Sequence, residues 1–135
     1  MSESRAQPES FRAREVSASF TVNDLAKSLA WYTDVLGFTV DREHEREGNL
    51  FAVSLKAGAV RVLITQDNGA KGADRAKGEG FSLMFTTAQN VDELAERIKA
   101  RGGSLATEPF DAFGARAFRI IDPDGFRFVI SSERQ

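Results

Sequence analysis

The sequence contains no cysteine and only one histidine, His44, among its 135 residues. Without cysteine the chain can form no disulfide, no thiolate metal site and no cysteine nucleophile. The cellular compartment therefore cannot be inferred from thiol chemistry. Any proposal for catalysis or metal binding has to rest on other side chains.

The chain also lacks a strong net charge and a long apolar run. The 18 basic and 20 acidic residues give a formal charge of −2, so nothing in the charge favours nucleic acid or an anionic membrane as a partner. The segment up to Glu15 contains no apolar run long enough for a signal peptide or a membrane span. We therefore expect a cytoplasmic protein with no nucleic-acid or membrane partner.

The length fits one compact domain with an adequate core. We predict a flexible, polar N-terminal arm over residues 1–14, followed by a single domain over residues 15–132. Within this domain the pattern of residues 15–65 starts again at residue 80. The glycine-rich segment 66–79 has no periodicity and is typical of a linker.

Each half predicts one strand, one helix and three further strands. In the first half, Val16–Val22 alternates like a strand, Asp24 can cap a helix that ends at Gly37, and three strand-like runs follow. In the second half the same order starts near Phe81. A shift of 65 carries Phe20 onto Phe85, and a shift of 66 carries "VRVLIT" onto "FRFVIS". The repeat predicts an α+β fold of two βαβββ modules.

The alternation also separates two faces of each sheet. Each helix must bury its apolar stripe on its own sheet, which places residues such as Ile64 and Phe128 under the helices. If the two sheets curve together, the opposite faces line a cleft, where small ligands bind. We expect ligand contacts there from Ser17, Ser19, Arg61, Leu63, Ser82, Met84, Arg127 and Val129.

Two segments resemble a known family. "VNDLAKSLAWYTDVLGF" (Val22 to Phe38) and "GARAFRIIDPDGFRFVI" (Gly114 to Ile130) are similar to the vicinal oxygen chelate superfamily of glyoxalases, bleomycin-resistance proteins and extradiol dioxygenases. The resemblance implies curved mixed sheets around a cleft, with the helices on the outer faces. It also implies a homodimer, which would cover exposed strand edges.

Enzymes of that family hold a divalent metal with one residue from the first and one from the last strand of each module. Motif by motif, these positions fall on Ser17, Leu63, Ser82 and Val129. Leucine and valine have no donor atom, and a neutral serine hydroxyl is a poor ligand beside imidazole or carboxylate. We therefore expect no metal, no other cofactor and no catalytic residue at these positions.

Other polar residues leave alternatives open. His44 lies in the charged run "DREHERE", which favours a solvated strand edge over a surface proton carrier or metal ligand. Arg61 and Arg127 occupy equivalent places and fit either anion recognition or solvent-exposed rim positions.

Three functions fit this sequence. The favoured one is a metal-free small-molecule binding protein of the glyoxalase/bleomycin-resistance type, for drug or metabolite sequestration. The second is an enzyme of the same superfamily, a lyase, isomerase or dioxygenase-like protein that uses non-standard residues; a buried acid or His44 in the cleft would favour it. The third is a regulatory or assembly module whose cleft is filled by side chains.

Overall fold

The computed structural model describes residues 10–72 and 75–134 and contains the tandem repeat. Each half follows the expected order of one strand, one helical segment and three strands, which confirms the α+β fold. Residues 1–9 of the arm predicted over residues 1–14 lie outside the described residues. The first module consists of β1 (Ala18–Val22), α1 (Leu25–Ala30), the π-helical turn η1 (Trp31–Val35), β2 (Thr39–Arg46), β3 (Asn49–Ala57) and β4 (Val60–Gln66). The second consists of β5 (Ser82–Thr87), α2 (Val91–Ala100), β6 (Leu105–Ala112), β7 (Ala115–Ile121) and β8 (Arg127–Ser132).

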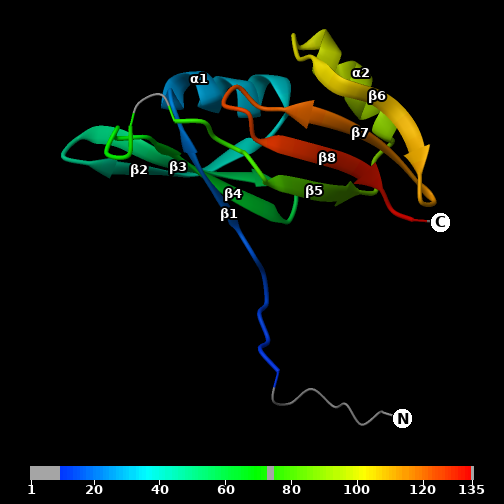
Figure 1. Cartoon of the computed structure of the whole chain (residues 1–135), viewed down its shortest axis with the longest axis horizontal. Coiled ribbons are helices and arrows are strands. Elements are labelled where there is room, and N and C mark those ends of the chain that lie inside the picture. Colours follow the sequence, from blue (N-terminus) through cyan, green and yellow to red (C-terminus); the bar gives the residue numbers. More distant parts are fainter. Residues whose placement is uncertain (1–9, 73–74, 135) are drawn as a thin grey trace.

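Each module forms its own four-stranded mixed sheet (Figure 1). The strand order is β1-β4-β3-β2 in one sheet and β5-β8-β7-β6 in the other. In both, the first strand pairs with the last in parallel, and the remaining neighbours are antiparallel. The identical topology confirms the repeat.

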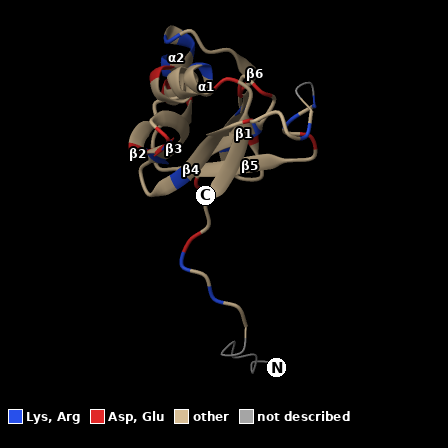
Figure 2. Ribbon diagram, turned by 90° about the vertical axis from the view of Figure 1, so that its left-hand side faces the viewer, with Lys and Arg blue, Asp and Glu red and all other residues tan. Residues whose placement is uncertain are grey.

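The two modules share one hydrophobic core. Both helices lie on the same side of the sheets (Figures 1 and 2). Beneath them, the ring of Phe20 from β1 lies 4.7 Å from that of Phe126 and 5.7 Å from that of Phe128 in the second module. Tyr32 and Phe118 are fully buried in the same cluster. Because aromatic packing of this kind crosses the boundary, the modules form one body.

The helix caps refine the internal alignment. The side chain of Asp24 accepts a hydrogen bond from the Lys27 amide, and Asn90 caps α2 in the same way, so the helices begin 66 residues apart. Their C-terminal glycines, Gly37 and Gly102, are only 65 apart. The turn η1 accounts for the extra residue in the first module, because a π turn holds one residue more than an α turn.

The first strand begins two residues later than the sequence predicts. The alternation placed Val16 on the buried face, but β1 begins at Ala18 and Val16 is 90% exposed. Ala18, opposite Val62, is the first residue of β1 with a partner in the sheet. The described residues before Ala18 run away from the body of the protein (Figure 2).

Within residues 10–72 and 75–134, the helices are too short and too polar to span a bilayer.

Candidate functional site

The faces of the two sheets that point away from the helices, here called the open face, carry the predicted ligand contacts. Residues paired across a ladder lie side by side and project to the same face. In the first module Ser19 is paired with Leu63. In the second module Ser82 is paired with Arg127, and Met84 with Val129. Ser17 lies just before β1 and is exposed.

The open face leaves apolar groups uncovered within one chain. Met84 is 73% exposed and Ile121, which is paired with Arg127, is 46% exposed. Leu63 and Val129 are half-buried. An uncovered apolar surface next to polar groups is typical of an interaction surface.

Basic side chains surround these apolar residues. The guanidinium of Arg61 lies 3.6 Å from Asp41 and 3.7 Å from Glu15. Arg127 makes no ion pair with any residue that the structure describes. The two predicted arginines therefore differ, because one is partly neutralised within the chain. The ladder register places three further basic residues on this face, namely Arg42, Lys56 and Arg119.

His44 lies on β2, an edge strand of its sheet, as the charge pattern suggested, and the register also places it on the open face. It is paired with Ala52, which is paired with Thr65, a residue on the same face as Leu63. The Nε2 atom of His44 lies 3.0 Å from Oγ of Ser54, within hydrogen-bond distance. The side chain is half-buried. Sequence reasoning missed this placement because β2 contains two irregularities, between Val40 and Arg42 and between His44 and Glu45, that change which residues face which side.

The four positions that would hold a metal do not fit one. Ser17, Leu63, Ser82 and Val129 supply two hydroxyls and two hydrocarbon side chains, and none supplies imidazole or carboxylate. Elsewhere in the described part of the chain, no group of three or more histidine, aspartate or glutamate residues is arranged to hold an ion.

A buried polar cluster joins the modules on the helix side. Asp122, only 4% exposed, accepts hydrogen bonds from Oη of Tyr32 at 2.7 Å and from the amides of Phe126 and Asp124. Burial is the main reason that the pKa values of both Tyr32 and Asp122 are raised. Asp124 in turn accepts from Ser28 Oγ at 3.3 Å. These bonds hold α1, through Ser28, and η1, through Tyr32, to the turn between β7 and β8.

The fold places this chain among the α+β proteins that are built from two tandem βαβββ modules, each with its first and last strands paired in parallel. Residues 16–130 match the family described as the Glyoxalase/Bleomycin resistance protein/Dioxygenase superfamily, and the chain belongs to that family.

Curated relatives carry lyase names. A lactoylglutathione lyase of Arabidopsis thaliana is 29% identical over 131 residues, which cover 91% of this chain but 45% of that protein. A probable lactoylglutathione lyase of Vibrio cholerae is 28% identical, with 84% and 86% covered. The chain thus spans less than half of the plant enzyme and most of the bacterial one.

Solved structures agree on the fold. A superfamily member from Sphaerobacter thermophilus has a TM-score of 0.70 at 27% identity and covers 90% of this chain and 98% of its own. TioX from Micromonospora has a TM-score of 0.72 at 18% identity, covering 89% and 98%, which is evidence for the fold alone.

Proposed function

We propose that this chain is a metal-free small-molecule binding protein of the glyoxalase/bleomycin-resistance type that sequesters a drug or metabolite on its open face. The observation that carries the proposal is the donor set at the four metal positions. A bound metal acts as Lewis acid and template in such enzymes. With Leu63 and Val129 in place of ligands, these positions favour contact with an apolar group.

The ligand on this face is an organic anion with an apolar body. Met84, Val129 and Ile121 offer apolar area, and Arg127 offers a guanidinium that is not neutralised by a described neighbour. Guanidinium groups bind carboxylates and phosphates through paired hydrogen bonds. The hydroxyl of Ser82, beside Arg127, adds a neutral donor.

The proposal includes a homodimer, in which a second copy of the chain covers the part of the open face that the ligand does not contact. One chain alone leaves Met84 and Ile121 exposed on this face. Symmetric pairing buries such surfaces in most soluble oligomers. Light scattering should give about twice the 14.8 kDa chain mass, and a single monomeric mass at high concentration would contradict it.

A second candidate function is catalysis without a metal, and the placement of His44 favours it. Its imidazole lies on the open face and contacts Ser54, an arrangement that can move a proton to or from a substrate bound there. Any turnover should then be abolished in His44→Gln, while ligand affinity stays within about threefold.

The experiment is a thermal-shift screen of antibiotics and metabolites, with and without divalent cations, because any native-state ligand raises apparent stability. Titration calorimetry of a hit should show Arg127→Ala weakening affinity by about tenfold to a hundredfold. Val129→Glu should weaken it as well, since it adds a carboxylate to the face. Arg75→Ala, on the linker, is the matched control. Unchanged affinity in both open-face variants would place the ligand elsewhere and reject the proposal.

A further inference from the structure

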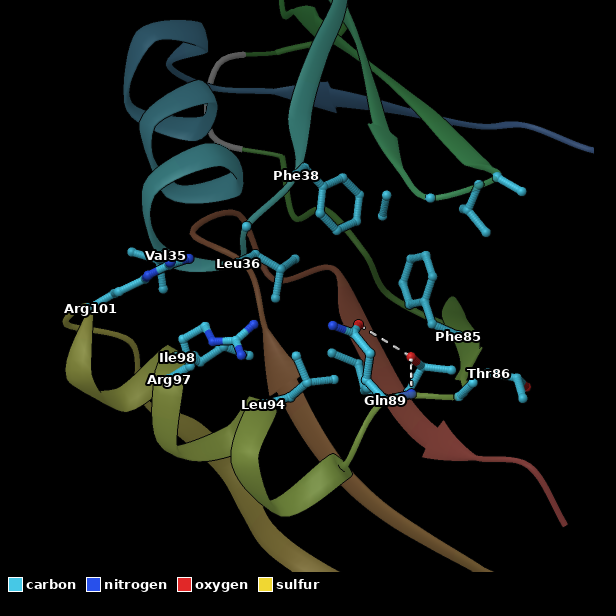
Figure 3. A pocket seen from close by; sticks show the side chains of 18 residues that line it. Val35, Leu36, Phe38, Phe85, Thr86, Gln89, Leu94, Arg97, Ile98 and Arg101 are labelled. Carbon is cyan, nitrogen blue, oxygen red and sulfur yellow. Dashed lines mark hydrogen bonds between the residues drawn. The ribbon is translucent and has the colours of Figure 1, made fainter.

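The repeat creates two equivalent junctions, in each of which the last turn of one module faces the helix of the other. The first junction is the polar cluster described above, where the turn 122–126 meets α1. The second junction is where the turn 57–60, between β3 and β4, faces α2. The structure fills the first junction with side chains and leaves a cavity of about 550 Å³ at the second (Figure 3).

The cavity lies where the internal alignment puts the counterparts of the first junction. The amide of Asn23 also donates to Asp124 in the first junction. At the offset of 66 that separates the two helix starts, Asn23, Ser28 and Tyr32 correspond to Gln89, Leu94 and Ile98. All three of these residues line the cavity. It is therefore the symmetry mate of a filled contact and not an accidental gap between modules.

The turn explains why one junction is hollow. Four residues, 57–60, separate the paired Lys56 and Arg61, whereas five, 122–126, separate Ile121 from Arg127. The longer turn supplies two carboxylates and the ring of Phe126, which is 9% exposed. The shorter turn, Ala-Gly-Ala-Val, supplies no carboxylate and ends in Val60, which is 40% exposed. What the second junction lacks is an aromatic ring and an acid group.

The walls of the cavity suit those missing groups. Phe38, Phe85, Leu36 and Leu94 provide apolar surface. Arg97 and Gln89 direct their polar ends toward the centre of the cavity, between Leu36 and Leu94 (Figure 3).

Arg101 adds a second guanidinium at the edge, beside Val35 and Gly37. Neither Arg97 nor Arg101 makes an ion pair with the residues that the structure describes. A volume of several hundred Å³, apolar walls and a few convergent polar groups are the usual features of a small-molecule site.

We propose that this second junction binds an aryl carboxylate, whose ring occupies the apolar part and whose carboxylate meets Arg97 and Arg101. The ligand supplies to the second junction what Phe126 and Asp122 supply to the first. The site is separate from the open face and does not depend on the function proposed for it.

The test uses 2-naphthoate as the probe and 2-naphthamide as its uncharged analogue, both measured by titration calorimetry on the full chain. The wild-type protein should bind 2-naphthoate saturably. Arg97→Gln combined with Arg101→Gln should weaken 2-naphthoate about tenfold but 2-naphthamide less than twofold, because only the charged contact is lost. Val60→Phe should place a ring in the cavity, as in the first junction, and weaken both probes at least tenfold.

Arg75→Gln, on the linker and outside both sites, is the matched control and should leave both affinities unchanged. Arg127→Gln reports any binding of the probe at the open face. Circular dichroism checks that each variant is folded. If Val60→Phe does not fold, the arginine variants alone decide the test. Absence of saturable 2-naphthoate binding up to several millimolar overturns the proposal. It is also overturned if only Arg127→Gln weakens binding, or if Val60→Phe changes the mass in light scattering while no probe binds, since the cavity is then a subunit contact.

Discussion

The two junctions between the modules have the same origin in the repeat and opposite contents. At the first, Asp122 and Tyr32 form a buried hydrogen bond and Phe126 packs on Phe20. At the second, a turn one residue shorter leaves a cavity beside α2. The contrast leaves space at the second junction, where the aryl carboxylate is proposed to bind.

The largest expected difference between the junctions is in aromatic packing. Phe126→Ala should lower the free energy of unfolding by about 3 kcal/mol, because it removes a ring that contacts Phe20 and Phe81 and leaves a void. Val60→Ala, the counterpart at the second junction, should cost less than about 1 kcal/mol because Val60 already borders the cavity. Urea denaturation measures both, and equal losses would contradict the contrast.

The polar bonds of the first junction come next. Asp122→Ala should cost about 2–3 kcal/mol, since the Tyr32 hydroxyl and two backbone amides lose their buried acceptor. Asp111→Ala is the control: its side chain is 84% exposed and its removal should change stability by less than about 0.5 kcal/mol. If Asp122→Ala behaves like the control, the buried bonds contribute nothing to holding η1 against the turn.

The linker also packs against the first junction. A Cβ atom on Gly78 would overlap the carbonyl group of Gly125, and Gly78 has φ +76°. Gly78→Ala should therefore cost about 2 kcal/mol or more. Gly69 has nearly the same φ, +77°, but open space around it, so Gly69→Ala should cost only about 1 kcal/mol. Similar thermal-unfolding midpoints for Gly78→Ala and Gly69→Ala would show that the linker does not pack closely against this turn.

The smallest expected effect is a pH dependence that only the first junction has. Burial raises the pKa of Asp122 above its ordinary value of 3.8, so the folded state binds this proton more tightly than the unfolded state does. Below pH 3.8 both states are protonated and the group costs nothing. As pH rises through the raised pKa, ionisation of the buried carboxyl lowers stability.

Asp122→Asn stays neutral throughout, so the stability of the wild type relative to this variant should fall as the pH rises above the ordinary carboxyl pKa of 3.8. Other carboxyls cancel in the difference. Urea midpoints at several pH values measure it, and a relative stability that rises with pH would show that the hydrogen bonds to Asp122 outweigh its burial.

Much of the fold could be predicted because it depends on regular features. Alternation at residues such as Ile64 and Phe128 indicates which face is buried, and Gly37 and Gly102 mark the helix ends. These features are local, so a single sequence contains them. The assignment of Ser17, Leu63, Ser82 and Val129 to the metal positions rests on the family resemblance and stays a prediction.

The remaining features depend on contacts between distant residues. His44 reaches the open face because of irregularities in β2, which no alternation pattern shows. The cavity beside Arg97 results from a difference of one residue between two turns. It can be recognised only once the fold places α2 opposite the shorter turn, residues 57–60. Whether Ser17, Ser19 and the other open-face residues contact a ligand stays a prediction, as does the cytoplasmic location.

The central claim, that the metal positions hold no metal, is tested most directly by elemental analysis of the dialysed protein together with titration of nickel and zinc. The positive control is a variant that combines Ser17→His, Leu63→Glu, Ser82→His and Val129→Glu, which supplies the usual types of ligand. The account predicts far less than one metal per chain in the wild type and metal binding in the control variant. One tightly bound zinc, nickel, iron or manganese per wild-type chain, or turnover that depends on such a metal, would contradict it.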